Sequence, residues 1–232
     1  MNAMHPVSVW REAWTLTCES LAAHKRLLLL AAALLTACVL YPANLQAYRE
    51  PAPLQSLAVR LAPHDATTFQ AELDLLDQGV QWVENRGRYI GNVVQVLLPL
   101  ILGDRVGLVQ LFFVSLATTT MTHCLKRVVN DLHVGPTRVG ERPNGGRHNM
   151  PSGHSSMAAS ALGYLWRRFG VWHVAYLLPV LLATMATRVL LSAHTIPAVM
   201  AGALIGVVLG YVMTTSRPDR TSHEDSRCSA RS

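Results

Sequence analysis

Apolar and polar segments alternate along the chain, and six of the apolar segments are candidates for transmembrane helices. Such a helix needs about 20 predominantly apolar residues to cross the hydrocarbon core of a membrane. The first segment reaches that length only with its flanking residues and the second is short, but we expect all six to span. The pattern therefore predicts an all-α bundle of six transmembrane helices. Their approximate bounds are 27–42, 89–102, 106–125, 155–166, 171–191 and 195–215.

The segments outside these six are polar or amphipathic. Residues 1–26 are mildly amphipathic and carry two tryptophans, which is typical of an interfacial helix lying on the membrane. The stretch 43–88 contains one amphipathic helix that either lies in the interface or covers the bundle. We expect the polar tail 216–232 to be disordered and cytoplasmic. The apolar face of the helix within 43–88 consists of Phe69, Leu73, Leu76, Val80 and Val83.

Length and composition support one membrane domain. The chain has 232 residues, half of them hydrophobic and only 15% charged, which is a low charged fraction for a soluble protein. The net charge of +6 comes from basic residues at the ends of apolar segments, which favours anchoring against anionic lipid over binding of nucleic acid. We therefore predict a single transmembrane domain over 27–215, with extracytoplasmic loops at 43–88 and 126–154.

The four cysteines are too far apart for a disulfide framework or a metal site. Leu35-Thr36-Ala37-Cys38 resembles a lipoprotein processing site, so cleavage before Cys38 is an alternative to a first span. The preceding segment is long for a signal peptide, and we prefer the span.

The loop from Arg142 to His154 has the composition of an anion-binding site. It places two arginines, two histidines and three glycines within thirteen residues, between two apolar segments. The apolar run after Ser155 predicts a helix whose amino end points back at the loop, so that free N–H groups face whatever the arginines attract. Further along the chain, Arg188 and His194 offer the same chemistry again.

Three short motifs resemble the signature of the type 2 phosphatidic acid phosphatase superfamily. They are Arg142-Pro143, then Pro151-Ser152-Gly153-His154, then Arg188 followed six residues later by His194. The signature covers about a third of the chain, and the Pro-Ser-Gly-His motif is its specific part. The resemblance implies membrane-embedded helices and removal of phosphate from a lipid, without a metal or other cofactor.

The same resemblance implies a role for each residue of the motifs. His194 is the expected nucleophile, which forms a phosphohistidine, and His154 is the expected acid that protonates the leaving oxygen. Arginine binds phosphate oxygens in pairs, and an arginine close to a membrane span indicates function. The expected phosphate-binding residues are Arg142, Arg188, Lys126, Ser152 and Gly153.

Two positions depart from the family pattern. The family lysine stands seven residues before the arginine of Arg-Pro, where this chain has Gly135, and Lys126 lies nine residues earlier. An insertion is needed for Lys126 to reach the site, and Arg127 or Arg138 are alternatives.

The second departure is Ala198, which stands where the family has an aspartate that orients the nucleophilic histidine. Loss of an orienting acid costs about 10⁴ in rate in other hydrolases. Glu141 or Asp131 takes over this role, or turnover is slow or lost. A sharp rise in activity of Ala198→Asp is the expected sign that the missing carboxylate limits the reaction.

A cytoplasmic amino terminus followed by six spans brings all three motifs to the outer face of the membrane. Both faces then hold ten basic residues, but six of the outer ten lie in or near the predicted site, so the positive-inside rule is met. We therefore expect a protein of the cytoplasmic membrane whose site faces the outside.

The leading hypothesis is thus a phosphatase acting on a lipid such as lipid A, undecaprenyl diphosphate or phosphatidylglycerophosphate, with a slight preference for lipid A. A second is a lipid-phosphate binding or transport protein that lost turnover with the aspartate. A metal site is a weaker third, because the histidine spacings match no known ligand pattern, and a nucleic-acid binder is weaker still. The oligomeric state stays open. The metal site would use His123, His133, His148, His154 and His194.

Overall fold

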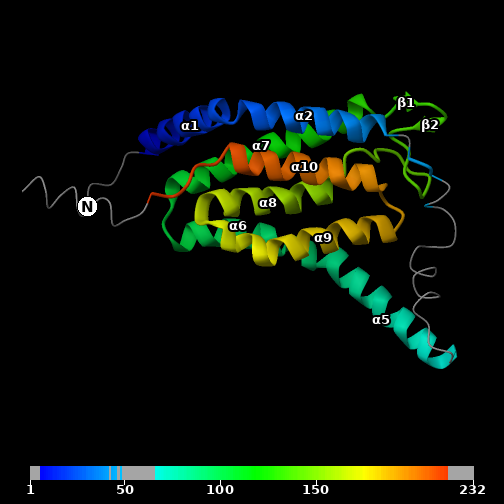
Figure 1. Cartoon of the computed structure of the whole chain (residues 1–232). Helices are drawn as coiled ribbons and strands as arrows, with labels where there is room; N and C mark the ends of the chain where they lie inside the picture. The colour runs from blue at the N-terminus through cyan, green and yellow to red at the C-terminus, as the bar shows by residue number, and fades with distance from the viewer. Residues whose placement is uncertain (1–5, 42, 46–47, 49–65, 219–232) are drawn as a thin grey trace, which may run out of the picture.

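The computed structural model describes residues 6–41, 43–45, 48 and 66–218, and within them the chain is mostly helical (Figure 1). This confirms the all-α class. Most of the predicted tail and much of the stretch 43–88 lie outside the described residues. The helices are α1 (Pro6–Ala23), α2 (Lys25–Leu40), α5 (Ala66–Asn85), α6 (Ile90–Ile101), α7 (Arg105–Val128), α8 (Gly153–Phe169), α9 (Val174–Leu190) and α10 (Ile196–Val212), with the short 3₁₀ helices η1 (Gly87–Tyr89) and η2 (Val171–His173).

Each of the six predicted apolar segments corresponds to one α-helix, but these helices differ in length. They are α2, α6, α7, α8, α9 and α10. Two stretches, Arg105–Val128 and Val171–Leu190, are long and apolar enough to cross a membrane. Helices α1 and α2 are bent by 69° at their junction and supply a third if they count as one broken span. The described part of the chain therefore has two or three helices that meet the requirements for a span by themselves.

The predicted amphipathic helix within 43–88 is α5. Val80 is buried and Leu76 and Val83 are partly buried, whereas Leu75 and Trp82 are exposed, so these three residues of the predicted apolar face point inward. The side chains of Phe69 and Leu73 lie outside the described part of the structure. In Figure 1, α5 extends away from the bundle, and its carboxyl end leads through η1 into α6.

Helix α8 occupies the centre of the bundle. It packs against α10, α9, α7 and α6, and in Figure 1 α10 lies between α8 and α2. The small residues of α10 make this approach possible, as the sequence predicts. A Cβ atom at Gly202 would overlap the carbonyl oxygen of Ser152, and one at Gly206 would overlap that of Ser156. The backbones of α8 and α10 are therefore in direct contact.

The connections at the end of the bundle where α8 begins carry the predicted site. The segment between α7 and α8 contains a short antiparallel pair, β1 (His133–Val134) and β2 (Thr137–Arg138), with His133 opposite Arg138. Figure 1 shows this pair at one end of the bundle, while the chain leaves α10 at the other end.

A buried ion pair lies at that other end. Arg168 of α8 is 3% exposed and donates to both carboxylate oxygens of Asp104, at 2.7 and 2.6 Å. Burial by itself raises the pKa of Asp104, but the hydrogen bonds from Arg168 and from the backbone of Gly107 hold it below its ordinary value. The sequence did not indicate this pair, in which Asp104 and the carbonyl of Thr215 enclose the guanidinium group of Arg168.

Candidate active site

The predicted site residues gather around one cavity of about 620 Å³. It lies among α6, α7, α8 and α9, and the loops at one end of the bundle close it. Ser152 does not line it, but is fully buried at the amino end of α8, where its hydroxyl accepts from the backbone N–H of Ser155 at 3.4 Å. The lining includes six of the seven predicted residues, namely Lys126, Arg142, Gly153, His154, Arg188 and His194.

The ring of His194 is held by a backbone carbonyl. His194 is 1% exposed, and its Nδ1 lies 2.7 Å from the carbonyl oxygen of Asn149. A carbonyl only accepts hydrogen bonds, so Nδ1 carries the proton and Nε2 is left unprotonated. Burial, with the charges of Arg142, Lys126 and Arg188, lowers the pKa of His194 to about 3, although the bond to Asn149 opposes this shift. His194 is therefore a neutral imidazole with a free Nε2.

Asn149 is itself fixed to the segment that carries His194. Its side-chain oxygen accepts from the backbone N–H of Thr195 at 3.1 Å, and its amide group donates to the Thr195 hydroxyl at 3.1 Å. Thr195 stands at the start of α10 as the sequence predicts, but its side chain makes no capping bond because its hydroxyl serves Asn149 instead. The sequence contains no signal for this clamp, because the group that contacts His194 is a main-chain carbonyl.

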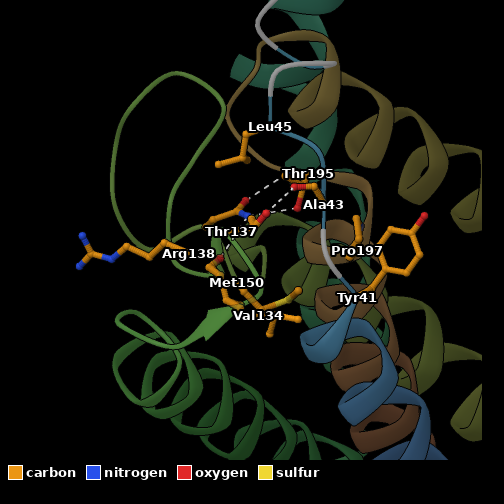
Figure 2. A pocket seen from close by; sticks show the side chains of 11 residues that line it. Tyr41, Ala43, Leu45, Val134, Thr137, Arg138, Met150, Thr195 and Pro197 are labelled. Carbon is orange, nitrogen blue, oxygen red and sulfur yellow. Dashed lines mark hydrogen bonds between the residues drawn. The ribbon is translucent and has the colours of Figure 1, made fainter.

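Figure 2 shows the surroundings of Thr195 in this clamp. Met150, Thr195 and Pro197 lie there around a small hollow. The hydroxyl of Thr137 closes it by donating to the carbonyl of Ala43 at 3.4 Å. The segment before α8 is therefore supported from behind by the chain that follows α2.

Neither carboxylate proposed to orient His194 does so. Asp131 is exposed and pairs with Arg138, and Nδ1 of His194, the position a carboxylate would bind, is taken by the Asn149 carbonyl. Hydrogen bonds from Asn130 and Arg138 lower the pKa of Asp131. Of the alternatives that the sequence left open, the substitute carboxylate is contradicted at Nδ1 of His194, where a neutral acceptor takes that place.

This geometry reverses the expected effect of Ala198→Asp. Ala198 is fully buried in an apolar cluster with Val129, Val139, Met150 and Ala201. A carboxylate there loses its hydration without gaining a partner. We expect Ala198→Asp to lower the unfolding temperature in detergent and to leave kcat at or below the wild-type value, with Ala198→Ser as the smaller control. A variant that is faster than wild type would contradict this expectation.

Lys126 reaches the site in spite of its distant position in sequence. Its Nζ lies 3.9 Å from the place where a Cβ atom on Gly153 would stand. Helix α7 continues to Val128, and the β1–β2 pair takes up the extra residues before Arg142. Arg127 is exposed, and Arg138 is bound to Asp131 and to the carbonyl of Asn130, so neither alternative cation serves the site.

Two residues that the sequence did not indicate enter the site from α5 and η1. Oε1 of Glu84 accepts from Nη1 of Arg188 at 2.6 Å and from Nη1 of Arg88 at 2.8 Å. Nη1 of Arg88 also lies 2.7 Å from Nε2 of His154. The only sequence signal was the amphipathic helix within 43–88, for which covering the bundle was one of two alternatives.

The site carries a large excess of positive charge. Arg188 is 7% exposed, and burial together with Arg188 lowers the pKa of Arg142. Within the described residues, no three histidine, cysteine, aspartate or glutamate side chains are grouped as a metal site requires, and His133 and His148 do not line the cavity. The arrangement suits a multiply charged anion.

The family comparison agrees with this geometry. The model of the PAP2 superfamily matches residues 107–222, half of the chain. This chain is a member of the PAP2 superfamily. As a PAP2 protein it is a membrane phosphatase that hydrolyses phosphate esters. The PAP2 match includes all seven predicted site residues and excludes Glu84 and Arg88.

Three curated relatives from Helicobacter pylori are similar to this PAP2 chain. The lipid A 1-phosphatase of strain J99 is 42% identical over 138 residues, which are 60% of this chain and 72% of the relative. The lipid A 1-phosphatase of strain 26695 is 41% identical over 136 residues, 59% of this chain and 72% of the relative. The lipid A 4'-phosphatase of strain J99 is 36% identical over 149 residues, which are 56% of this chain and 73% of the relative. No solved structure is significantly similar to the chain.

Proposed function

We propose that this protein removes a phosphate group from a lipid of the lipid A class through a phosphohistidine on His194. The observation that carries the proposal is that the unprotonated Nε2 of His194 belongs to a ring lining the same cavity as His154 and three cations. The names of the relatives support the substrate class.

Each residue has a defined part in this reaction. Arg142, Arg188 and Lys126 bind the phosphoryl oxygens, and the backbone N–H groups at the amino end of α8, at Gly153, add donors behind the Ser152 cap. Nε2 of His194 attacks phosphorus, the P–O bond to the lipid breaks, and His154 protonates the leaving alkoxide. Water then attacks phosphorus, gives its proton to His154 and releases inorganic phosphate. No metal or other cofactor takes part in these steps.

The shape and polarity of the cavity favour a sugar-containing lipid. Besides the cations, its walls on α6, α7 and α8 present hydroxyl and amide groups, which suit the hydroxyl groups of a phosphorylated sugar better than a bare acyl chain. Undecaprenyl diphosphate and phosphatidylglycerophosphate are the other candidates. The polar wall consists of Asn92, Gln95, Ser115, Thr118, Thr119, Thr122, Ser156 and Ser160.

The proposed setting is the cytoplasmic (inner) membrane, crossed six times by one domain over 27–215, with the amino terminus inside. With six spans and this amino terminus, the loops that carry the site lie on the periplasmic side, and the chain leaves α10 at the opposite end of the bundle (Figure 1). Residues 1–26 lie in the interface and 216–232 form a cytoplasmic tail.

The alternative of a lipid-binding protein without turnover rested on Ala198. A carbonyl that holds Nδ1–H of His194 supplies the correct tautomer and ring orientation, which are the chief contributions of the aspartate in related triads. The contact with Asn149 therefore supports turnover over binding alone.

The test is phosphate release by the purified full chain in detergent, from a panel of lipid phosphates. We expect lipid A, or its tetra-acylated disaccharide bisphosphate core, to give the highest kcat/KM, and mass spectrometry to show loss of one phosphate. No release from any lipid, or a clear preference for undecaprenyl diphosphate, would overturn the proposed substrate.

A further inference from the structure

The carboxylate of Glu84 takes the place that an anionic ligand would occupy. A single oxygen, Oε1, bridges Nη1 of Arg188 and Nη1 of Arg88 at 2.6 and 2.8 Å. These are the distances of charge-assisted hydrogen bonds between guanidinium groups and a phosphate oxygen. The two arginines are thus already spaced to share one oxygen of a bound phosphate.

We infer that Arg88 is a further phosphate-binding residue of the site, and that Oε1 of Glu84 holds the place of a phosphoryl oxygen between Arg88 and Arg188 until substrate arrives. The inference rests on the proposed phosphatase function, and it extends the site to α5 and η1, outside the part of the chain that the family model matches.

The balance of charge supports exchange of Glu84 for phosphate. Three cations line the cavity, Lys126, Arg142 and Arg188, and Arg88 is linked to them through Glu84, the carboxylate that pairs with both Arg88 and Arg188. A phosphomonoester dianion carries twice the charge of Glu84 and offers three oxygens in place of one bridging oxygen. Phosphate therefore satisfies the cations better than the resident carboxylate does.

Unsatisfied polar groups show that the arrangement with Glu84 is incomplete. Among the described residues, the buried Nε atoms of Arg88, Arg142 and Arg188 have no hydrogen-bond partner, and neither has Oε2 of Glu84. Buried polar groups without partners raise the free energy of the state that contains them. Displacement of Glu84 by a ligand with more oxygens therefore costs little free energy.

The contact between Arg88 and His154 links phosphate binding to the acid. Guanidinium only donates hydrogen bonds, so Nε2 of His154 accepts from Arg88 and cannot at the same time carry the proton needed by a leaving oxygen. When phosphate replaces Glu84, Arg88 keeps its hydrogen bond to the phosphoryl oxygen but gives up the one to His154, and Nε2 takes up a proton from hydronium or a buffer acid beside the new negative charge. The acid is thereby formed only after the substrate has bound.

A purely structural role predicts different behaviour. If Glu84 and Arg88 served only to attach α5 to the bundle, removing either would lower stability without a specific effect on anion binding. If Glu84 instead aligned Arg188 for phosphate, its loss would weaken anion binding. Our inference requires tighter binding without Glu84 and weaker binding without Arg88.

The experiment measures binding of orthovanadate, a tetrahedral oxyanion, to the full chain in detergent by calorimetry, which needs no turnover. We expect Arg88→Ala to raise the Kd about tenfold, the usual effect of losing one charge-assisted hydrogen bond, and Arg88→Lys to restore part of the affinity. Glu84→Gln should lower the Kd about threefold, because the ion pair that competes with vanadate is lost and such pairs are weak. Unfolding temperatures of all variants are measured in parallel.

Charge-matched controls come from the same segment. Arg86→Ala removes an exposed arginine two residues away, and Asp77→Asn removes an exposed carboxylate of α5 whose hydrogen bond is to Gln81. Both should bind vanadate like the wild type. An unchanged Kd in Arg88→Ala, or weaker binding in Glu84→Gln, overturns the inference. Vanadate binding that follows our expectation without phosphate release from any lipid would instead refute the proposed function alone.

Discussion

Phosphate release should fall by about four orders of magnitude or more when His194 is replaced by alanine, because the group that forms the bond to phosphorus is lost. Burial and the neighbouring cations lower the pKa of His194 to about 3, so the wild-type ring is a neutral nucleophile at neutral pH. The measurement is steady-state release of inorganic phosphate from the best substrate of the lipid panel.

His194→Asn is the matched variant. Its side-chain N–H can occupy the position of Nδ1–H and keep the bond to the Asn149 carbonyl, while Nε2 is absent. We expect a folded protein that binds vanadate and is as inactive as His194→Ala. Turnover close to the wild-type rate in either variant would contradict a phosphohistidine at this position.

Arg168→Ala should destabilise the protein by about 3–5 kcal/mol, since it leaves the buried Asp104 carboxylate without its partner. Arg168 donates two hydrogen bonds to Asp104 and a third to the carbonyl of Thr215 at 2.9 Å, so it ties together the ends of α7, α8 and α10. The measurement is unfolding in detergent followed by circular dichroism.

The control is Arg167→Ala, which removes a neighbouring guanidinium that stacks at 5.2 Å over Tyr211 instead of pairing with a buried acid. Its effect should be about 1 kcal/mol, the size of a partly exposed cation–π contact. Equal losses in the two variants would mean that the ion pair at Asp104 contributes nothing particular to stability.

The sequence predicted most of the helices and most of the site. Apolar runs located six segments that became helices, and short motifs identified five residues that line one cavity and Ser152 behind it, while Lys126 lines the cavity in spite of its departure from the family spacing. These predictions succeeded because hydrophobic runs and side-chain chemistry are visible in the residue types themselves.

What the sequence did not reveal depends on contacts between distant positions. The Asn149 carbonyl is a backbone group and leaves no trace in residue type, and Arg168 meets Asp104 across 64 positions. Glu84 and Arg88 gave no signal of their own, because the pattern of an amphipathic helix does not show which residues its polar face contacts. The number of spans also stays a prediction, since α6, α8 and α10 are only 12, 17 and 17 residues long.

The backbone contact between α8 and α10 has a consequence for how this enzyme can change over time. His154 stands on the first turn of α8 and His194 just before α10. The contact between the two helices at Gly202 and Gly206 therefore fixes the separation of the two imidazoles. The stretch that joins α7 to the signature loop does not set that separation, and its β1–β2 pair can lengthen or shorten while both imidazoles keep their places. An added side chain at Gly202 or Gly206 would therefore change the separation of the two imidazoles, whereas a change in the length of the hairpin would not.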